Sequence, residues 1–123
     1  MENGPLVSVV DDDESVRESL PDLLREFGFT VETFASAEEF LASGRIAETR
    51  CLVLDIAMPG MSGPDLQREL TQRRQKVPIV FMTAHADKTI FPRLIEQGAA
   101  ACLLKPFSDT ALRDALDAAL TPP

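Results

Sequence analysis

The sequence predicts an α/β fold, a doubly wound parallel sheet with helices on both faces. Apolar runs of strand length alternate with helical patterns, and four of the runs are continuously apolar, as is typical of strands covered on both faces. The length of 123 residues fits one domain, and we expect a single domain over 1–123 with its core from about 6 to 120. The predicted strands lie near 6–10, 30–34, 51–55, 79–83 and 101–104, and the predicted helices near 14–27, 37–43, 64–73, 89–97 and 109–120.

The first elements are predicted from short apolar runs and a glycine. Residues 6–10 read Leu-Val-Ser-Val-Val, and the helical pattern after them stops before Gly28, a residue suited to the C-terminal end of a helix. Pro21 falls inside this helix, where its ring and its missing N–H predict a kink. The run at 30–34 alternates polar and apolar residues, which predicts an edge strand.

Capping residues and prolines predict where the middle helices begin and end. Ser36 with Glu39 forms the pattern of a capping box before the second helix. Pro64 suits the first turn of the third helix. Pro92 either breaks the fourth helix or stands in the first turn of a helix that begins late, and the late start is the favoured interpretation. Gly98 stands where the C-terminal cap of this helix is expected.

The last predicted helix begins after Ser108, a good N-cap residue. One face of this helix is apolar and is formed by Leu112, Leu116, Ala119 and Leu120. Residues 121–123, Thr-Pro-Pro, then stop it. They either begin a linker to an output domain absent from this chain or are a natural end, and the sequence does not decide between the two.

Composition excludes several classes of function. The net charge of −8 and the pI near 4.5 argue against direct binding of nucleic acid, because phosphate binding requires a basic surface. No apolar run approaches the roughly 20 residues of a membrane span, and the N-terminus lacks the basic and apolar regions of a signal peptide. We therefore expect a cytoplasmic protein without membrane contact.

The two cysteines are expected to be reduced. Cys51 and Cys102 fall in predicted buried strands, where a free thiol behaves as a small hydrophobe. If the strand order is 2-1-3-4-5, another strand separates them, which makes a disulfide improbable and agrees with the expected compartment. Cysteines and the single histidine are together too few for a zinc site.

Polar residues with related chemistry close the predicted strands. Asp11 and Asp12 follow the first strand, Asp55 ends the third, Thr83 ends the fourth and Lys105 follows the fifth. The carboxyl ends of parallel strands meet at one edge of the sheet, where ligands and ions bind in open α/β folds. Three carboxylates, a hydroxyl and an ammonium at this edge predict a site for a divalent cation and a phosphoryl group.

Each of these residues also has a plainer interpretation. Acids after a strand are often helix N-caps, so Asp12 or Asp13 could cap the first helix, and Thr83 fits a strand by its shape alone. Asp55 is harder to explain in this way, because it ends a strongly apolar strand and has no evident cap or partner. Placing it beside Asp11 would raise the pKa of one carboxyl unless a cation intervenes. Mg²⁺ is the natural counter-ion, because it prefers oxygen ligands.

Four motifs carry a resemblance to a known family. They are Val9-Val10-Asp11-Asp12, Leu54-Asp55-Ile56-Ala57-Met58-Pro59-Gly60-Met61-Ser62-Gly63, Met82-Thr83-Ala84 and Lys105-Pro106-Phe107. From about Leu6 to Leu120 the chain resembles a response-regulator receiver domain of the CheY-like family. Two further motifs, Ser36-Ala37-Glu38-Glu39-Phe40-Leu41 and Thr83-Ala84-His85, make it most similar to receivers of the FixJ/NarL kind. The resemblance implies a flavodoxin-like, five-stranded parallel sheet of order 2-1-3-4-5 with five helices.

The same resemblance implies a magnesium-dependent phosphoryl site. Asp55 would be the phosphoacceptor. Mg²⁺, or Mn²⁺ in its place, would be held by Asp12 and Asp55 and by the backbone carbonyl of Ala57, with Asp11 acting mainly through water. Asp13 matches a position that is often acidic, and we expect only a capping or peripheral role for it.

The resemblance also implies how the chain signals. Lys105, joined to Pro106 by a cis bond, would pair with the phosphoryl group, and the Thr83 hydroxyl would move toward it and pull the following loop. The phosphoryl donor would be a sensor histidine kinase or a phosphotransfer protein. Homodimerisation on phosphorylation and control of transcription through a C-terminal domain are further implications. We expect no enzymatic activity beyond the chain's own phosphorylation and dephosphorylation.

Two positions depart from the family or leave their role open. Cys102 stands where the family has a rotating aromatic residue on the fifth strand, so the coupling from Thr83 to this strand should be weakened or rerouted. His85 is either a solvated loop residue or controls the access of water to the phosphoryl group.

Two other classes of protein compete with the phospho-accepting receiver. A phosphohydrolase with an aspartyl-phosphate intermediate needs a second acid two residues after the nucleophile, and this chain has Ala57 there. An adaptor with a receiver fold but no phosphorylation would be favoured by loss of an acid, the threonine or the lysine, and all of these are present. The phospho-accepting receiver is therefore the leading interpretation.

Overall fold

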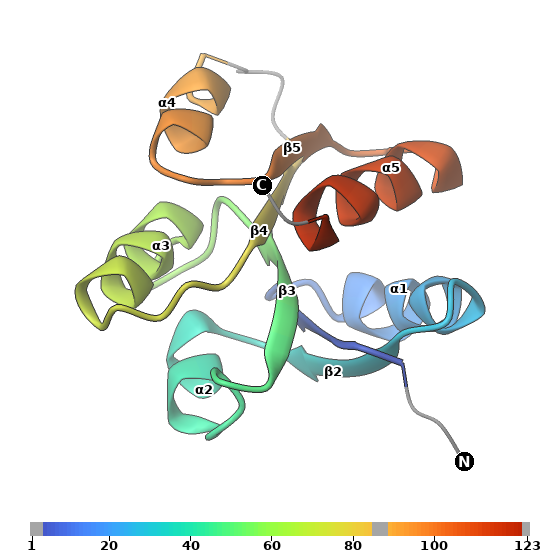
Figure 1. Cartoon of the computed structure of the whole chain (residues 1–123), viewed down its shortest axis with the longest axis horizontal. Helices are drawn as coiled ribbons and strands as arrows, with labels where there is room; N and C mark the ends of the chain where they lie inside the picture. The colour runs from blue at the N-terminus through green and yellow to red at the C-terminus, as the bar shows by residue number, and fades with distance from the viewer. Residues whose placement is uncertain (1–3, 85–88, 122–123) are drawn as a thin grey trace.

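A computed structural model describes residues 4–84 and 89–121, which form one parallel sheet between two layers of helices (Figure 1). The strands are β1 (Leu6–Val10), β2 (Thr30–Phe34), β3 (Thr49–Asp55), β4 (Ile79–Thr83) and β5 (Ala101–Leu104). The helices are α1 (Glu14–Glu26), α2 (Ala37–Ala42), α3 (Gly63–Gln72), α4 (Phe91–Glu96) and α5 (Asp109–Leu120). The predicted fold class and all ten predicted elements are confirmed.

The sheet has the order β2-β1-β3-β4-β5, and every neighbouring pair is parallel. This order is the predicted one. It places β2 at an edge, as its alternating pattern predicted, and it places β5 at the other edge. All four residues of β5 are only half-buried, so the expectation that this continuously apolar strand is covered like the central ones was wrong. An edge strand lacks a neighbour on one side, which leaves β5 and Cys102 more open than composition alone indicated.

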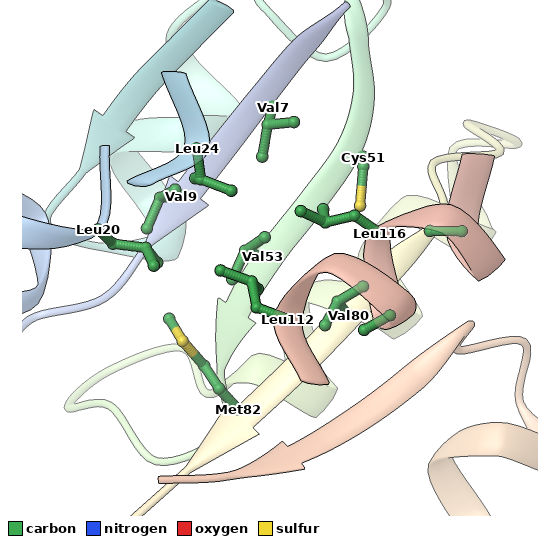
Figure 2. Close-up of a cluster of buried hydrophobic side chains, with 12 residues drawn as sticks. Val7, Val9, Leu20, Leu24, Cys51, Val53, Val80, Met82, Leu112 and Leu116 are labelled. Atoms are coloured by element: carbon green, nitrogen blue, oxygen red, sulfur yellow. The ribbon is translucent and has the colours of Figure 1, made fainter. Parts of the chain in front are cut away.

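The sheet separates two apolar cores. The first lies under α1 and α5, and Figure 2 shows side chains from alternate positions of β1, β3 and β4 pointing toward these two helices. Its members from the strands are Val7, Val9, Cys51, Val53, Val80 and Met82. The second core lies under α2, α3 and α4 and takes the intervening strand residues, among them Val10, Leu52, Leu54 and Phe81. Because successive side chains point to opposite faces, a strand covered on both faces must be apolar throughout.

The cysteines lie in separate strands and form no disulfide. Cys51 in β3 is buried, whereas Cys102 in β5 is half-buried, and both are free thiols. Burial raises the pKa of Cys51 to about 12 and that of Cys102 to about 11. Both thiols therefore stay protonated at neutral pH and act as small apolar groups.

Helix N-termini follow the predicted caps with one correction. The Ser36 hydroxyl accepts from the Glu39 N–H at 3.0 Å, but the Glu39 carboxylate accepts from the N–H of Ala35 rather than from that of Ser36. The capping box expected at α2 is therefore incomplete. A complete box begins α3, where Ser62 and Asp65 each accept from the other's backbone N–H. Ser62 ends the loop that follows Asp55 and Asp65 lies in the first turn of α3, so this box lies outside the pattern from which the first box was predicted.

The remaining helix boundaries agree with the sequence. Pro64 lies in the first turn of α3, and Ser108 caps α5 through the Ala111 N–H at 3.0 Å. Pro92 lies in the first turn of α4, which confirms the late start. Pro21 lies inside α1, which continues without interruption, and the kink there stays a prediction.

Gly98 has a φ of +109°, a left-handed conformation that ends α4 where the C-terminal cap was predicted. Within the described residues, no helix has the length and apolar composition that crossing a membrane requires.

Gly63 is required by space rather than by backbone conformation. A Cβ at this position would lie 2.4 Å from the Asp55 carbonyl oxygen and 3.1 Å from the Phe81 ring. The start of α3 therefore packs directly on the end of β3, which fixes the loop between them.

We predict that Gly63→Ala lowers the free energy of unfolding by about 2 kcal/mol, because the added methyl group meets backbone that has no room to move. Urea unfolding followed by far-UV circular dichroism measures this quantity. Gln72→Ala, at the exposed end of the same helix, is the control and should change stability by no more than about 0.5 kcal/mol. Equal stability of the two variants would contradict the close packing of α3 on β3.

Candidate functional site

The carboxyl edge of the sheet gathers the residues that the sequence singled out. Asp55 ends β3, Thr83 ends β4, and Asp11 and Lys105 directly follow β1 and β5. The register of the strands brings these strand ends close together: Val10 pairs with Leu54, and Asp55 pairs with Met82. A backbone bond of 2.7 Å from the Lys105 N–H to the Thr83 carbonyl closes this edge between β4 and β5. The parallel sheet therefore brings together groups that are up to 94 residues apart in sequence.

Three carboxylates form the centre of the site. Asp11, Asp12 and Asp55 each offer an oxygen, and these oxygens all lie within 4.8 Å of one another. Asp11 is 1% exposed and Asp55 6%, whereas Asp12 is exposed at the surface. The cluster is thus built from two buried acids and one open to solvent, a donor set of hard oxygen ligands that suits Mg²⁺. Ala57, whose carbonyl was expected to complete the set, lies exposed in the loop after Asp55.

Lys105 provides a positive charge inside the cluster. Its Nζ lies 2.8 Å from Asp11 Oδ2 and 3.4 Å from Asp55 Oδ1. Among the residues that the structure describes, it is the only side chain with a salt bridge to these acids. One ammonium against three carboxylates leaves two negative charges uncompensated when all the acids are ionised. The Lys105–Pro106 bond is cis, as the resemblance implied.

Asp11 is held in one orientation by partners on both oxygens. Its Oδ2 accepts from Lys105, and its Oδ1 accepts from the Asp13 N–H at 2.9 Å. Arg17 in α1 donates to the Asp11 main-chain carbonyl at 2.9 Å and so fixes the loop that carries the first two acids. This contact was not predicted. The sequence feature that could have indicated it is an arginine in the first turn of a helix, where the helix dipole disfavours a positive charge.

Asp13 has the capping role that was expected of it. Its carboxylate accepts from the backbone N–H of Ser15 at 2.9 Å and from the Ser15 hydroxyl at 2.8 Å. These hydrogen bonds lower the pKa of Asp13. Of the two candidate caps, it is Asp13 that begins α1, which leaves the exposed Asp12 carboxylate available for a cation.

The environment raises the pKa of Asp55 to about 6, and burial is the largest cause. Repulsion by the Asp11 charge adds to this rise, while the Lys105 charge opposes it. For Lys105, burial works to lower the pKa, but the hydrogen bond to Asp11 and the charges of both acids raise it by more. The rise at Asp55 therefore has the direction expected for a buried carboxyl beside another acid, and Lys105 offsets only part of it.

Two other positions singled out in the sequence lie at the end of β4 and within β5. Thr83 is 2% exposed and lies at the end of β4, beside the strand that carries Asp55. Cys102, where the resemblance implied an aromatic residue in other family members, pairs with Phe81 in the ladder and is half-buried. His85 lies outside the described residues.

Removing the charge of Asp55 should stabilise the metal-free domain at neutral pH. A carboxyl whose pKa rises from 3.8 unfolded to about 6 folded favours the folded state fully below pH 3.8, and this advantage is lost as the pH rises toward 6. At pH 7.5 we therefore predict that Asp55→Asn increases the free energy of unfolding by about 2 kcal/mol in EDTA, and that the gain shrinks near pH 4 or when Mg²⁺ is added.

Urea unfolding followed by circular dichroism tests this, since the chain has no Trp or Tyr to report by fluorescence. Asp22→Asn, which removes an exposed carboxylate from α1, is the control and should have little effect. A less stable Asp55→Asn variant at pH 7.5 would contradict the electrostatic account of the cluster.

Sequence comparisons place the chain in a known family. Residues 7–117 match the family described as the response regulator receiver domain. Nodulation protein W of Bradyrhizobium diazoefficiens is 46% identical over 114 residues, which cover 93% of this chain and 50% of that protein. Transcriptional regulatory protein FixJ of Azorhizobium caulinodans is 41% identical over 114 residues, which cover 93% of this chain and 54% of that protein.

Solved structures agree. The response regulator StyR is 51% identical with a TM-score of 0.88, covering 95% of this chain and 59% of that one. FixJ-N is 37% identical with a TM-score of 0.84, covering 98% of this chain and 95% of that one. The chain spans about half the length of the curated relatives that it matches. By sequence and by architecture, the chain belongs to the family of response regulator receiver domains of two-component signal transduction systems.

Proposed function

We propose that Asp55 accepts a phosphoryl group and that this modification switches the domain between two signalling states. One observation carries the proposal: Asp55 lies at the carboxyl edge of the sheet, between two other acids and beside Lys105. A carboxylate surrounded in this way is poorly explained by stability, because burial and the neighbouring acids disfavour its charge by more than Lys105 favours it. It is well explained as a nucleophile that works with a cation.

The acids fit a divalent cation by their chemistry. Asp12 and Asp55 would hold Mg²⁺, or Mn²⁺, together with the backbone carbonyl of Ala57, and Asp11 would act mainly through water. The last assignment agrees with the two hydrogen bonds that Asp11 already accepts. When bound, the ion supplies positive charge that offsets the crowded carboxylates and the phosphoryl oxygens.

Phosphoryl transfer at this site requires positioning and charge rather than acid–base chemistry. With a pKa of about 6, Asp55 is mostly ionised at pH 7.5 and can act as a nucleophile. Its carboxylate oxygen would attack the phosphorus of a phosphohistidine in line with the leaving imidazole nitrogen. Lys105 would then turn from Asp55 to the phosphoryl oxygens. Water attacking the acyl phosphate along the same line releases phosphate and restores the carboxylate.

Signalling would start at Thr83 and reach α4. The hydroxyl at the end of β4 would move toward the new phosphoryl oxygens and pull the chain that leads into α4. This six-residue helix, with Leu94 as its buried residue, is a small element that a modest free-energy difference can shift. Cys102 has no ring to rotate, so this route would bypass β5.

The proposed partners are inferred from the family, and the proposed output domain from the length of the relatives. Two-component receivers take their phosphoryl group from a sensor histidine kinase or a phosphotransfer protein, and we propose the same for this chain. Since the relatives are about twice as long and FixJ is named a transcriptional regulator, we propose that a C-terminal DNA-binding domain carries the output. Homodimerisation on phosphorylation would bring two such domains together.

The alternatives account for less of the site. A phosphohydrolase lacks its second acid, because Ala57 stands two residues after Asp55. An adaptor without phosphorylation does not explain why three acids lie close together with Lys105 paired to two of them.

Incubation with acetyl phosphate and Mg²⁺, followed by intact-mass measurement, tests the proposal. We expect a single phosphoryl adduct that is absent in EDTA and absent in the Asp55→Ala variant. Asp22→Asn should be phosphorylated like the wild type. An adduct that persists in Asp55→Ala would move the acceptor to another residue. Absence of an adduct despite bound Mg²⁺, repeated with a phosphohistidine donor, would favour the adaptor.

A further inference from the structure

The loop between Asp55 and α3 is anchored at both ends. The Ile56 N–H donates to the Met82 carbonyl at 2.9 Å, which ties the start of the loop to β4. The Gly63 N–H donates to the Ile56 carbonyl at 3.0 Å, which closes the loop on itself. Six residues, 57–62, lie between these anchors; Ser62 caps α3, and the remaining residues 57–61 include Ala57.

The middle of this loop is tied to α2 by Glu38. The Met61 N–H donates to Glu38 Oε2 at 3.1 Å, a contact across 23 residues of sequence. Gly60 has a φ of +73°, and a Cβ added there would lie 2.9 Å from the same Glu38 oxygen. Glycine is needed at this turn both for its backbone conformation and for the close approach of the carboxylate. Among the described residues, this is the hydrogen bond that joins residues 57–61 to another element of the fold.

The Glu38 carboxylate is presented from a fixed support. Its neighbour Ala37 and Phe40, two residues on, are both 0% exposed and hold α2 against the sheet. Ser36 caps the helix in front of it. The side chain itself is exposed, so its contribution comes from the hydrogen bond that its oxygen accepts from a backbone N–H at the surface.

We propose that Glu38 is a positioning residue for the metal and phosphoryl site. By fixing residues 57–61, it holds the Ala57 carbonyl where the cation would bind. A loop that is free to move must be ordered when the cation binds, and that ordering reduces affinity. The inference rests on the proposed function, because it assigns Ala57 to the same Mg²⁺.

Magnesium titrations of the unphosphorylated protein by isothermal calorimetry test this assignment. We expect Glu38→Ala to raise the Kd for Mg²⁺ about fivefold, because the loop loses its bond to α2. Glu38→Gln keeps an acceptor oxygen without the charge and should restore the Kd to within about twofold of the wild type. Glu39→Ala removes the adjacent charge from the same helix turn and, as the control, should leave the Kd within about twofold.

The amide proton of Met61, followed by NMR, reports the contact itself. Its signal should move upfield in Glu38→Ala and stay near the wild-type position in Glu38→Gln. An unchanged Kd in Glu38→Ala, with Mg²⁺ binding intact in the wild type, would overturn the inference and leave the proposed function standing. Equal weakening in Glu38→Ala, Glu38→Gln and Glu39→Ala would also overturn it, because charge alone would then explain the effect. A wild type that binds no Mg²⁺ would refute both.

Discussion

The burial of two neighbouring carboxylates, those of Asp11 and Asp55, is the constraint on which the rest of the site depends. Both carboxylates are nearly inaccessible to water, and one ammonium, that of Lys105, lies between them. Isolated burial of such charges is unfavourable, and the pKa of Asp55 rises to about 6 as a result. A divalent cation lowers the unfavourable free energy of these buried carboxylates, and a phosphoryl group on Asp55 changes the charge distribution around them. A receiver domain needs a site whose state changes with its ligands, and crowded acids provide one.

The fold keeps the two buried acids, Asp11 and Asp55, close together. Asp11 is held through both carboxylate oxygens, and Asp55 ends a strand that is buried along its last five residues. The start of α3 packs on the end of β3 at Gly63 with no room for a methyl group. The strands that carry the acids and Thr83, β1, β3 and β4, are central and are covered by an apolar core on each face, so the cores resist a shift of these strand ends. The packing of the strands and of α3 therefore holds the carboxylates in an arrangement that is electrostatically unfavourable.

Sequence reasoning reached the fold and the principal acids because both depend on local patterns. Continuous apolar runs marked β1, β3 and β4, and the residue after each run gave the chemistry of the edge. The predicted start of β3 was two residues too late, because the strand includes the polar residues Thr49 and Arg50, which precede the apolar run. The roles of Arg17 and Glu38 were missed for another reason: each bonds a backbone group that only the folded chain brings near. Tertiary contacts of this kind leave no periodic signal in one sequence.

The pKa of the Asp55 carboxyl, measured by carbon-13 NMR with and without Mg²⁺, tests the central claim most directly. The account predicts a pKa of about 6 in the metal-free protein and a large fall when Mg²⁺ saturates the site, because the ion's charge offsets both the burial of the carboxylate and the repulsion from Asp11. Repeating the titration in Asp11→Asn should lower the metal-free value, since one repelling charge is gone. A metal-free pKa near the ordinary 3.8, or one that Mg²⁺ leaves unchanged, would contradict the account.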